Sequence, residues 1–219
     1  MKLFLDTADY KLLEEWASKG IIDGVTTNPT HLAKEGGDPK KVVQNIAELF
    51  PQGSISVEVT EVEAQKVYEQ ARKIADLAEN IVVKVPCYPD YYPVIQKLVR
   101  ENIPLNITLV FTLTQSLCMC KLGVRYISPF IGRLDDIDTS GIDLILQIRA
   151  MIDEYGYDTQ LLAASIRSVN HLHAVIQAGA DVATVPVEVL HKALHHPLTK
   201  QGMDKFLADW KKLGITQFP

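Results

Sequence analysis

The feature that most constrains the fold of this chain is the regular alternation of short apolar runs with longer amphipathic stretches. Short runs of mostly apolar residues, several of them rich in β-branched side chains, predict eight strands, at residues 3–6, 24–28, 54–60, 81–85, 105–110, 126–130, 160–164 and 182–185. Apolar residues spaced three and four apart predict nine helices, at residues 10–18, 39–50, 62–79, 91–100, 113–122, 141–155, 170–178, 187–195 and 198–213. Strict alternation of strand and helix indicates a parallel sheet covered by helices.

The number of repeats narrows the fold further. Eight strand–helix units in 219 residues predict an α/β protein with a small (β/α)8 barrel. An open doubly wound sheet is the alternative, but no GxGxxG pattern follows the first predicted strand. Since no linker or low-complexity tract interrupts the chain, we predict one domain over residues 1–219 with an extra C-terminal helix.

Composition and charge exclude several classes of protein. The net charge is −5, with 22 basic and 27 acidic residues, which argues against a nucleic-acid surface. No apolar run approaches the roughly 20 residues of a membrane helix, and the first residues show no secretory signal pattern. The three cysteines fit a reducing compartment better than a disulfide framework. We therefore expect a cytoplasmic protein without nucleic-acid or membrane partners.

A single lysine, Lys84, stands inside the otherwise apolar run at residues 81–86. An ammonium group in such a strand is short of water, which disfavours its charged form. A lysine that is partly a free amine can attack a carbonyl and form a Schiff base. The alternative is a lysine that reaches solvent or pairs with a carboxylate, and this segment alone does not decide between the two.

Polar side chains gather at the ends of the predicted strands, where a (β/α)8 barrel carries its active site. They are Asp6, Asn28, Glu58, Lys84, Asn106, Thr108, Ser128, Arg133, Ser165 and Arg167. Each alone could have a purely structural role; Asp6, for example, could cap the next helix, and Asn28 before Pro29 could turn the chain. Because buried polar groups are costly unless they find partners, their convergence on one barrel mouth favours a shared active site.

The chemistry of these side chains suggests separate roles. Glu58, on the strand beside Lys84, can supply an acid–base group through a water. Asp6 can take the proton of a substrate hydroxyl as a carbon–carbon bond breaks, whereas Asn28 and Asn106 can hold hydroxyls without changing charge.

Arg133, Arg167 and Ser165 form a candidate pocket for a phosphate, since the planar guanidinium group matches an oxyanion. A sugar phosphate is therefore the expected ligand. Surface ion pairs of the arginines with Asp135 or Asp136 are the alternative, and the spacing leaves both open.

A metal site is the competing hypothesis, based on five late histidines. His191 and His195 have the i, i+4 spacing of one helix face, but no glutamate follows His191 as in HExxH. We expect these histidines on outer helices, facing solvent or another subunit, and no metal.

Six stretches now identify a resemblance, and two more extend it to the C-terminal region. They are LDTA (5–8), GVTTNP (24–29), VVKVP (82–86), NITLVF (106–111), ISPFIGRLDD (127–136), AASIR (163–167), HPLT (196–199) and FLADW (206–210). In this order they resemble the transaldolases, in the short single-domain branch that also includes fructose-6-phosphate aldolase.

This resemblance implies a (β/α)8 barrel in which a lysine forms a Schiff base with a ketose phosphate. A dihydroxyacetone unit would pass from sedoheptulose 7-phosphate or fructose 6-phosphate to glyceraldehyde 3-phosphate or erythrose 4-phosphate. The reaction belongs to the non-oxidative pentose phosphate pathway and needs no metal or cofactor. By the same resemblance, the catalytic set is Lys84, Asp6, Glu58 and Thr108, with Glu58 and Thr108 positioning the catalytic water. The substrate-binding set is Asn28, Asn106, Ser128, Phe130, Arg133, Ser165 and Arg167.

Two positions separate the subfamilies. By the resemblance, transaldolases carry Glu and Phe where the aldolases carry Gln and Tyr, and this chain has Glu58 and Phe130. Transaldolase is therefore favoured over an aldolase that releases free dihydroxyacetone. A non-catalytic sugar-phosphate binder is a further alternative, but it would not need Lys84.

The resemblance also implies rings of five subunits that stack into decamers, with the C-terminal helix (198–213) docked on a neighbouring subunit. A helix packed on its own barrel is the alternative. The chain departs from the family pattern at residues 87–93, which are rich in aromatics and proline. There, Tyr88 either covers the mouth or packs within the loop.

Overall fold

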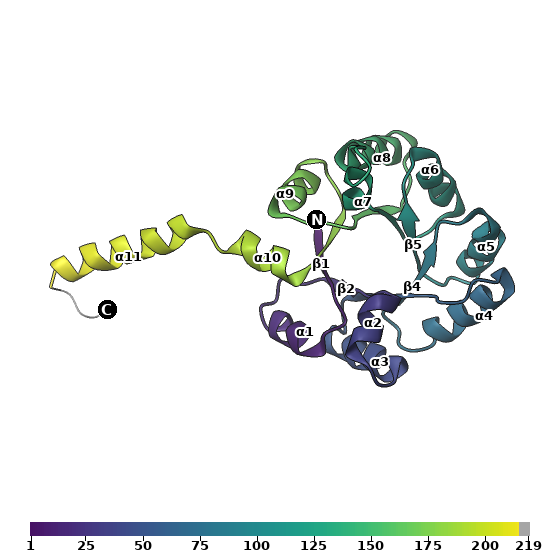
Figure 1. Ribbon diagram of the computed structural model, residues 1–219, viewed down its shortest axis with the longest axis horizontal. Helices are drawn as coiled ribbons and strands as arrows, with labels where there is room; N and C mark the ends of the chain where they lie inside the picture. Colours follow the sequence, from purple (N-terminus) through teal and green to yellow (C-terminus); the bar gives the residue numbers. More distant parts are fainter. Residues whose placement is uncertain (215–219) are drawn as a thin grey trace.

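The computed structural model describes residues 1–214, and its strands form a closed parallel barrel in chain order (Figure 1). The strands are β1 (Lys2–Asp6), β2 (Gly24–Thr26), β3 (Ser54–Glu58), β4 (Ile81–Pro86), β5 (Leu105–Val110), β6 (Tyr126–Pro129), β7 (Gln160–Ala163) and β8 (Val182–Val185). The predicted (β/α)8 barrel is confirmed, since β8 also pairs with β1. Residues 215–219 of the predicted domain lie outside the described part.

Helices surround the barrel on its outer side (Figure 1). They are α1 (Tyr10–Ala17), α2 (Pro29–Glu35), α3 (Pro39–Leu49), α4 (Ala64–Ala75), α5 (Tyr92–Arg100), α6 (Leu113–Leu122), α7 (Ile131–Asp135), α8 (Gly141–Tyr155), α9 (Val169–Gln177), α10 (Val187–Leu194) and α11 (Pro197–Lys212), with the short 3-10 helix η1 (Pro89–Tyr91). Except for α11, which projects away, these helices pack on the barrel, and apolar side chains of the helices and of the strands form the main core.

Two of these helices, α2 and α7, were not predicted. They have seven and five residues, too few to show a helical period. Asn28 was predicted as the last residue of a strand, with a turn before Pro29 as the alternative, whereas it caps α2 by accepting from the backbone N–H of His31 at 3.0 Å. For this reason β2 ends at Thr26, earlier than predicted.

The lower half of the barrel interior is apolar and filled. Phe4 packs edge-on against Tyr126, with ring centroids 6.0 Å apart, and the Tyr126 hydroxyl lies 3.1 Å from Ser54 Oγ. A Cβ at Gly24 would come within 2.4 Å of the Ser54 carbonyl oxygen, so only glycine fits here. Three more fully buried side chains complete this layer: Val82, Leu162 and Val182. The barrel is thus plugged below its mouth.

The upper half of the interior is polar because the strands pair in register. Asp6 lies beside Thr26 across β1 and β2, and Lys84 lies between Glu58 on β3 and Asn106 on β5. Since side chains alternate along a strand, residues two positions above the apolar plug point into the same space. The register therefore places the predicted catalytic side chains at one end of the barrel.

The helix α11 projects away from the barrel (Figure 1). None of its residues is buried, and apolar side chains along it are exposed: Leu198, Met203, Phe206 and Leu207. The alternative of a helix packed on its own barrel is therefore wrong for this chain. Within residues 1–214, no helix is long and apolar enough to cross a membrane.

Candidate active site

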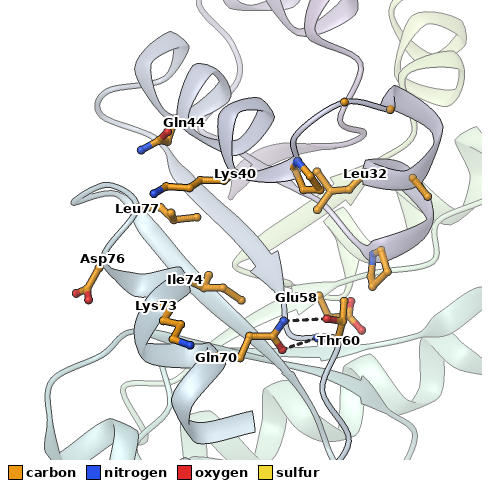
Figure 2. Close-up of a pocket in the computed structure, with 15 residues that line it drawn as sticks. Leu32, Lys40, Gln44, Glu58, Thr60, Gln70, Lys73, Ile74, Asp76 and Leu77 are labelled. Carbon is orange, nitrogen blue, oxygen red and sulfur yellow. Dashed lines mark hydrogen bonds between the residues drawn. The ribbon is translucent and has the colours of Figure 1, made fainter. Parts of the chain in front are cut away.

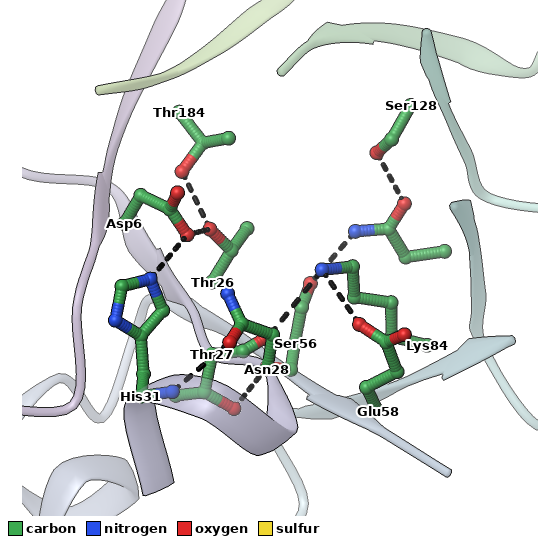
Figure 3. A network of polar contacts seen from close by, with 11 residues as sticks. Asp6, Thr26, Thr27, Asn28, His31, Ser56, Glu58, Lys84, Ser128 and Thr184 are labelled. Atoms are coloured by element: carbon green, nitrogen blue, oxygen red, sulfur yellow. Dashed lines mark hydrogen bonds and ion pairs between the residues drawn. The ribbon is translucent and has the colours of Figure 1, made fainter. Parts of the chain in front are cut away.

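Lys84 and Glu58 form a largely buried ion pair in the barrel mouth (Figure 3). The lysine Nζ lies 3.0 Å from Glu58 Oε2 and 3.4 Å from the carbonyl oxygen of Thr27, and Lys84 is 5% exposed. The sequence left open a nucleophile or a paired lysine, and the structure shows a paired one. Pairing does not remove the chemistry, because a carboxylate at this distance can also accept a proton from the ammonium group.

A chain of neutral hydrogen bonds lies beside Lys84. The Ser128 hydroxyl donates to Asn106 Oδ1 at 2.6 Å, and Asn106 Nδ2 donates to Ser56 Oγ at 3.0 Å. All three residues are at most 1% exposed. The chain fixes the amide of Asn106 without introducing charge next to the lysine.

Asp6 is held on the opposite side of the mouth. Its Oδ1 accepts from the Thr26 hydroxyl at 2.9 Å and lies 3.5 Å from His31 Nε2, and Thr26 is 2.6 Å from the hydroxyl of Thr184. Burial acts to raise the pKa of Asp6, but the hydrogen bond from His31, the charge of Lys84 and the Thr26 hydroxyl together hold this pKa below its usual range. Asp6 is therefore ionised at neutral pH.

Thr108 presents a polar atom without a partner. Its hydroxyl is buried and makes no hydrogen bond to the described residues. It stands next to a register shift between β5 and β6, where Leu109 adopts the left-handed region with φ of 56°. An unpaired hydroxyl and a strained backbone at one place are typical of a site that binds a small polar molecule.

Two adjacent cavities open at these residues, with volumes of about 170 and 380 Å3. Both are lined by Asn28, Lys84, Phe130 and Arg133. Asp6, Ser128 and Ser165 line the inner cavity, and Glu58 and Thr108 line the outer one. Nine of the eleven predicted site residues thus share one mouth, and Asn106 contacts it through Ser128.

The predicted phosphate end divides into two parts. Arg133 lies over the ring of Phe130, 5.1 Å from its centroid, and faces both cavities with Ser165 at the rim of the inner one. Arg167 lines neither cavity and forms a bidentate ion pair with Asp136, as the alternative interpretation of the sequence expected. The exposed Arg167–Asp136 pair is worth little in stability and can exchange partners.

A larger groove of about 900 Å3 lies beside the mouth, between α2 and α3 on one side and α4 on the other (Figure 2). Glu58 is at its inner end. The side chain of Gln70 closes the nearby loop by accepting from the backbone N–H groups of Thr60 and Glu61, at 2.8 and 2.9 Å. Leu32, Ile74 and other mainly apolar side chains line the rest.

The remaining predicted features lie away from the mouth. Tyr88 packs edge-on against Tyr91, with centroids 5.3 Å apart, and lines neither cavity, so it packs within its loop. His191 and His195 stack at 4.0 Å. In the part of the chain that the structure describes, no three His, Cys, Asp or Glu side chains are grouped as a metal site.

The sequence interpretation missed four residues of the mouth: Thr26, His31, Ser56 and Thr184. The three on strands occupy inward positions of the alternating pattern, which could have revealed them. His31 could have been found from the Asn-Pro helix start, which places it in the first turn of α2.

A closed parallel barrel with a buried lysine–carboxylate pair at its polar mouth is the architecture of a (β/α)8 enzyme. The model of the transaldolase/fructose-6-phosphate aldolase family matches residues 3–217. The chain therefore belongs to this family, as the resemblance indicated.

Relatives cover nearly the full length of the chain. It is 43% identical over 217 residues to a probable transaldolase of Lactiplantibacillus plantarum, covering 99% of this chain and 100% of the relative. It is 47% identical over 215 residues to a probable transaldolase of Parvibaculum lavamentivorans, covering 98% of each chain. A probable transaldolase of Maricaulis maris is 46% identical over 214 residues, again with 98% of each chain covered.

Proposed function

We propose that this protein is a transaldolase, which moves a dihydroxyacetone unit from a ketose phosphate to an aldose phosphate. The family and the names of its relatives, each a probable transaldolase, support this activity. The observation that carries the proposal is the buried Lys84–Glu58 pair facing both cavities of the mouth. A protein that only binds sugar phosphates has no use for an amine buried in this way.

The reaction begins with a proton transfer. Glu58 takes a proton from the Lys84 ammonium group, and the free amine attacks C2 of the ketose to give a carbinolamine. Loss of the C2 hydroxyl as water then gives the Schiff base, with Glu58 returning the proton. The 3.0 Å contact between the two side chains makes this transfer direct before substrate enters.

Thr108 and Glu58 are the proposed holders of the water that takes part in this dehydration and its reversal. The Thr108 hydroxyl is buried without a partner, and both side chains line the outer cavity beside Lys84. A water held there would satisfy the hydroxyl and would lie within reach of the carboxylate.

Asp6 is the proposed base for carbon–carbon cleavage. It takes the proton of the C4 hydroxyl, the C3–C4 bond breaks, and the aldose phosphate leaves as an aldehyde. The bonding electrons form a C2–C3 double bond, and the electrons of the C2–N double bond move onto the nitrogen. The Schiff base on Lys84 thereby becomes an enamine. Attack of this enamine on the acceptor aldehyde reverses the steps, and Asp6 returns the proton.

The other predicted residues bind the substrate. Asn28, which lines both cavities, and Asn106, which bonds to Ser128 at the inner cavity, are the proposed partners of the hydroxyls of the dihydroxyacetone unit. Arg133 and Ser165 would bind the phosphate, since Arg133 faces both cavities. Arg167 could join them only by exchanging Asp136 for the phosphate.

Phe130 and Glu58 support transfer over release. Releasing free dihydroxyacetone requires protonation of the enamine, and Phe130 carries no hydroxyl that could assist. We therefore favour transaldolase over fructose-6-phosphate aldolase activity for this chain.

The setting we propose is the non-oxidative pentose phosphate pathway in the cytoplasm, without a cofactor, metal or nucleic-acid partner. A homo-oligomer, a pentamer or a decamer, is the proposed assembly. The exposed apolar side chains of α11, which projects from the barrel, support docking of this helix on a neighbouring subunit.

The experiment is borohydride reduction in the presence of fructose 6-phosphate, followed by peptide mass mapping. We expect a covalent adduct on Lys84 and none in Lys84→Met, with the exposed Lys73→Met as the matched control. An adduct on another lysine, or none, would contradict the Schiff-base mechanism. A coupled assay then separates transfer from release: turnover should require erythrose 4-phosphate, and rapid release of dihydroxyacetone without an acceptor would indicate the aldolase.

A further inference from the structure

His31 lies over Asp6 because of the way α2 begins. Asn28 caps the helix, and its Oδ1 accepts from the His31 backbone N–H at 3.0 Å, which fixes the first turn beside the mouth. The His31 side chain is 24% exposed and lines the outer cavity. A long polar side chain at this position therefore reaches the active site instead of solvent.

The two oxygens of the Asp6 carboxylate have different surroundings. Oδ1 receives the Thr26 hydroxyl at 2.9 Å and faces His31 Nε2 at 3.5 Å, while no described residue donates a hydrogen bond to Oδ2. Figure 3 shows both contacts on one oxygen and the second oxygen directed away from them. Fixing one oxygen from two sides orients the other.

His31 also affects the charge of Asp6. Among the groups that lower the pKa of this carboxyl against its burial, the hydrogen bond from His31 comes before the charge of Lys84. The other charged groups that line the same cavities are Glu58 on β3 and Arg133 on α7.

We propose that His31 is a positioning residue for Asp6, whose imidazole Nε2 holds Oδ1 and leaves Oδ2 to exchange a proton with the substrate hydroxyl. This inference rests on the proposed function, in which Asp6 is the base for carbon–carbon cleavage. His31 acts through Asp6 and does not take part in forming the Schiff base on Lys84.

Two substitutions at His31 separate this role from packing. His31→Leu fills similar space without a donor, whereas His31→Gln places an amide Nε2 at a similar reach but cannot be protonated. The matched controls are His173→Leu and His173→Gln, since His173 is exposed on α9 away from the mouth. Each variant is assayed for transfer from fructose 6-phosphate to erythrose 4-phosphate across pH, with circular dichroism to verify folding.

For His31→Leu we expect kcat to fall about tenfold at neutral pH, with a smaller change in KM. The acid limb of kcat/KM should move to higher pH by about one unit, because the Asp6 carboxylate loses a donor. His31→Gln should recover most of kcat and shift the limb less. Borohydride trapping of fructose 6-phosphate on Lys84 should persist in both variants.

Two outcomes would overturn the role of His31. One is a pH profile of His31→Leu that coincides with that of the wild type, and the other is an equal loss in the Leu and Gln variants with no shift of the limb. If the wild-type protein itself forms no adduct on Lys84, the proposed function fails and this role fails with it. Trapping in the wild type combined with an unmoved acid limb rejects His31 alone.

Discussion

Glu58 and Lys84 occupy paired positions on adjacent parallel strands, and their side chains meet 3.0 Å apart inside the barrel. The pairing of β3 and β4 therefore places the carboxylate and the amine in contact before any substrate binds. Both groups are largely removed from water, so each charge offsets the desolvation cost of the other.

Removing one member of this pair should therefore destabilise the protein. We expect Lys84→Met to lower the free energy of unfolding by about 1–3 kcal/mol, because it leaves a buried carboxylate unpaired. Lys84→Met/Glu58→Gln should recover most of this loss, since both charges are then gone. Urea unfolding at pH 7 measures both values. Additive losses in the double variant would show that the two groups are not coupled.

Thr108→Val should separate stability from activity. The valine has nearly the same shape and removes a buried hydroxyl that has no partner, so the free energy of unfolding should stay equal or rise by about 1 kcal/mol. The rate of transfer should fall at least tenfold if the hydroxyl holds the catalytic water. Thr159→Val is the matched control, because the Thr159 hydroxyl donates to the Val124 carbonyl, and its removal should lower stability without affecting the chemistry. A Thr108→Val enzyme of wild-type activity would reject the water site.

Asp6 should make the stability of the fold depend on pH on the acid side. The pKa of Asp6 in the folded protein is lowered. Asp6 therefore contributes its full stability at pH values above its ordinary pKa of about 4. This contribution is lost as the pH falls through the lowered pKa. Asp6→Asn should therefore be less stable than the wild type from pH 7 down to about 5, with the difference shrinking below about pH 4. Urea midpoints across this range provide the measurement. A stability difference between Asp6→Asn and the wild type that grows towards low pH would contradict the lowered pKa of Asp6.

The helix α11 should control the assembly of the protein. Phe206→Asp/Leu207→Asp places two charges among its exposed apolar side chains and should convert an oligomer to monomers while leaving the barrel folded. Light scattering after size-exclusion chromatography gives the mass. Gln201→Asp, an exposed position on the same helix, serves as the control and should leave the mass unchanged. A double variant with the wild-type mass would mean that α11 does not hold the subunits together.

The barrel could be predicted because short, mostly apolar strand segments alternate with helical segments along the whole barrel. The position of Lys84 beside Glu58 also followed, since neighbouring strands of a parallel barrel bring inward residues into the same layer. The order of strands and helices and the inward positions within two short strands were enough to predict both the barrel and this contact.

Other parts of the site depend on geometry that no local pattern records. The register shift between β5 and β6 lies where Leu109 adopts the left-handed region, and nothing in the residues around Leu109 signals it. Arg167 has a long side chain that can reach either the mouth or Asp136, and the fold places it on Asp136. The contact between His31 and Asp6 requires a helix of seven residues, which is too short to be recognised from periodicity.

The layer formed by Phe4, Tyr126 and their neighbours makes the barrel blind-ended. In the proposed reaction the departing aldose and the incoming acceptor must then pass through the same mouth of the barrel, one after the other. During that exchange the three-carbon fragment would also be able to leave through the mouth if it were not bonded to Lys84. In the proposed reaction the covalent link to Lys84 therefore also keeps the three-carbon fragment in the site while one aldose leaves and the other enters.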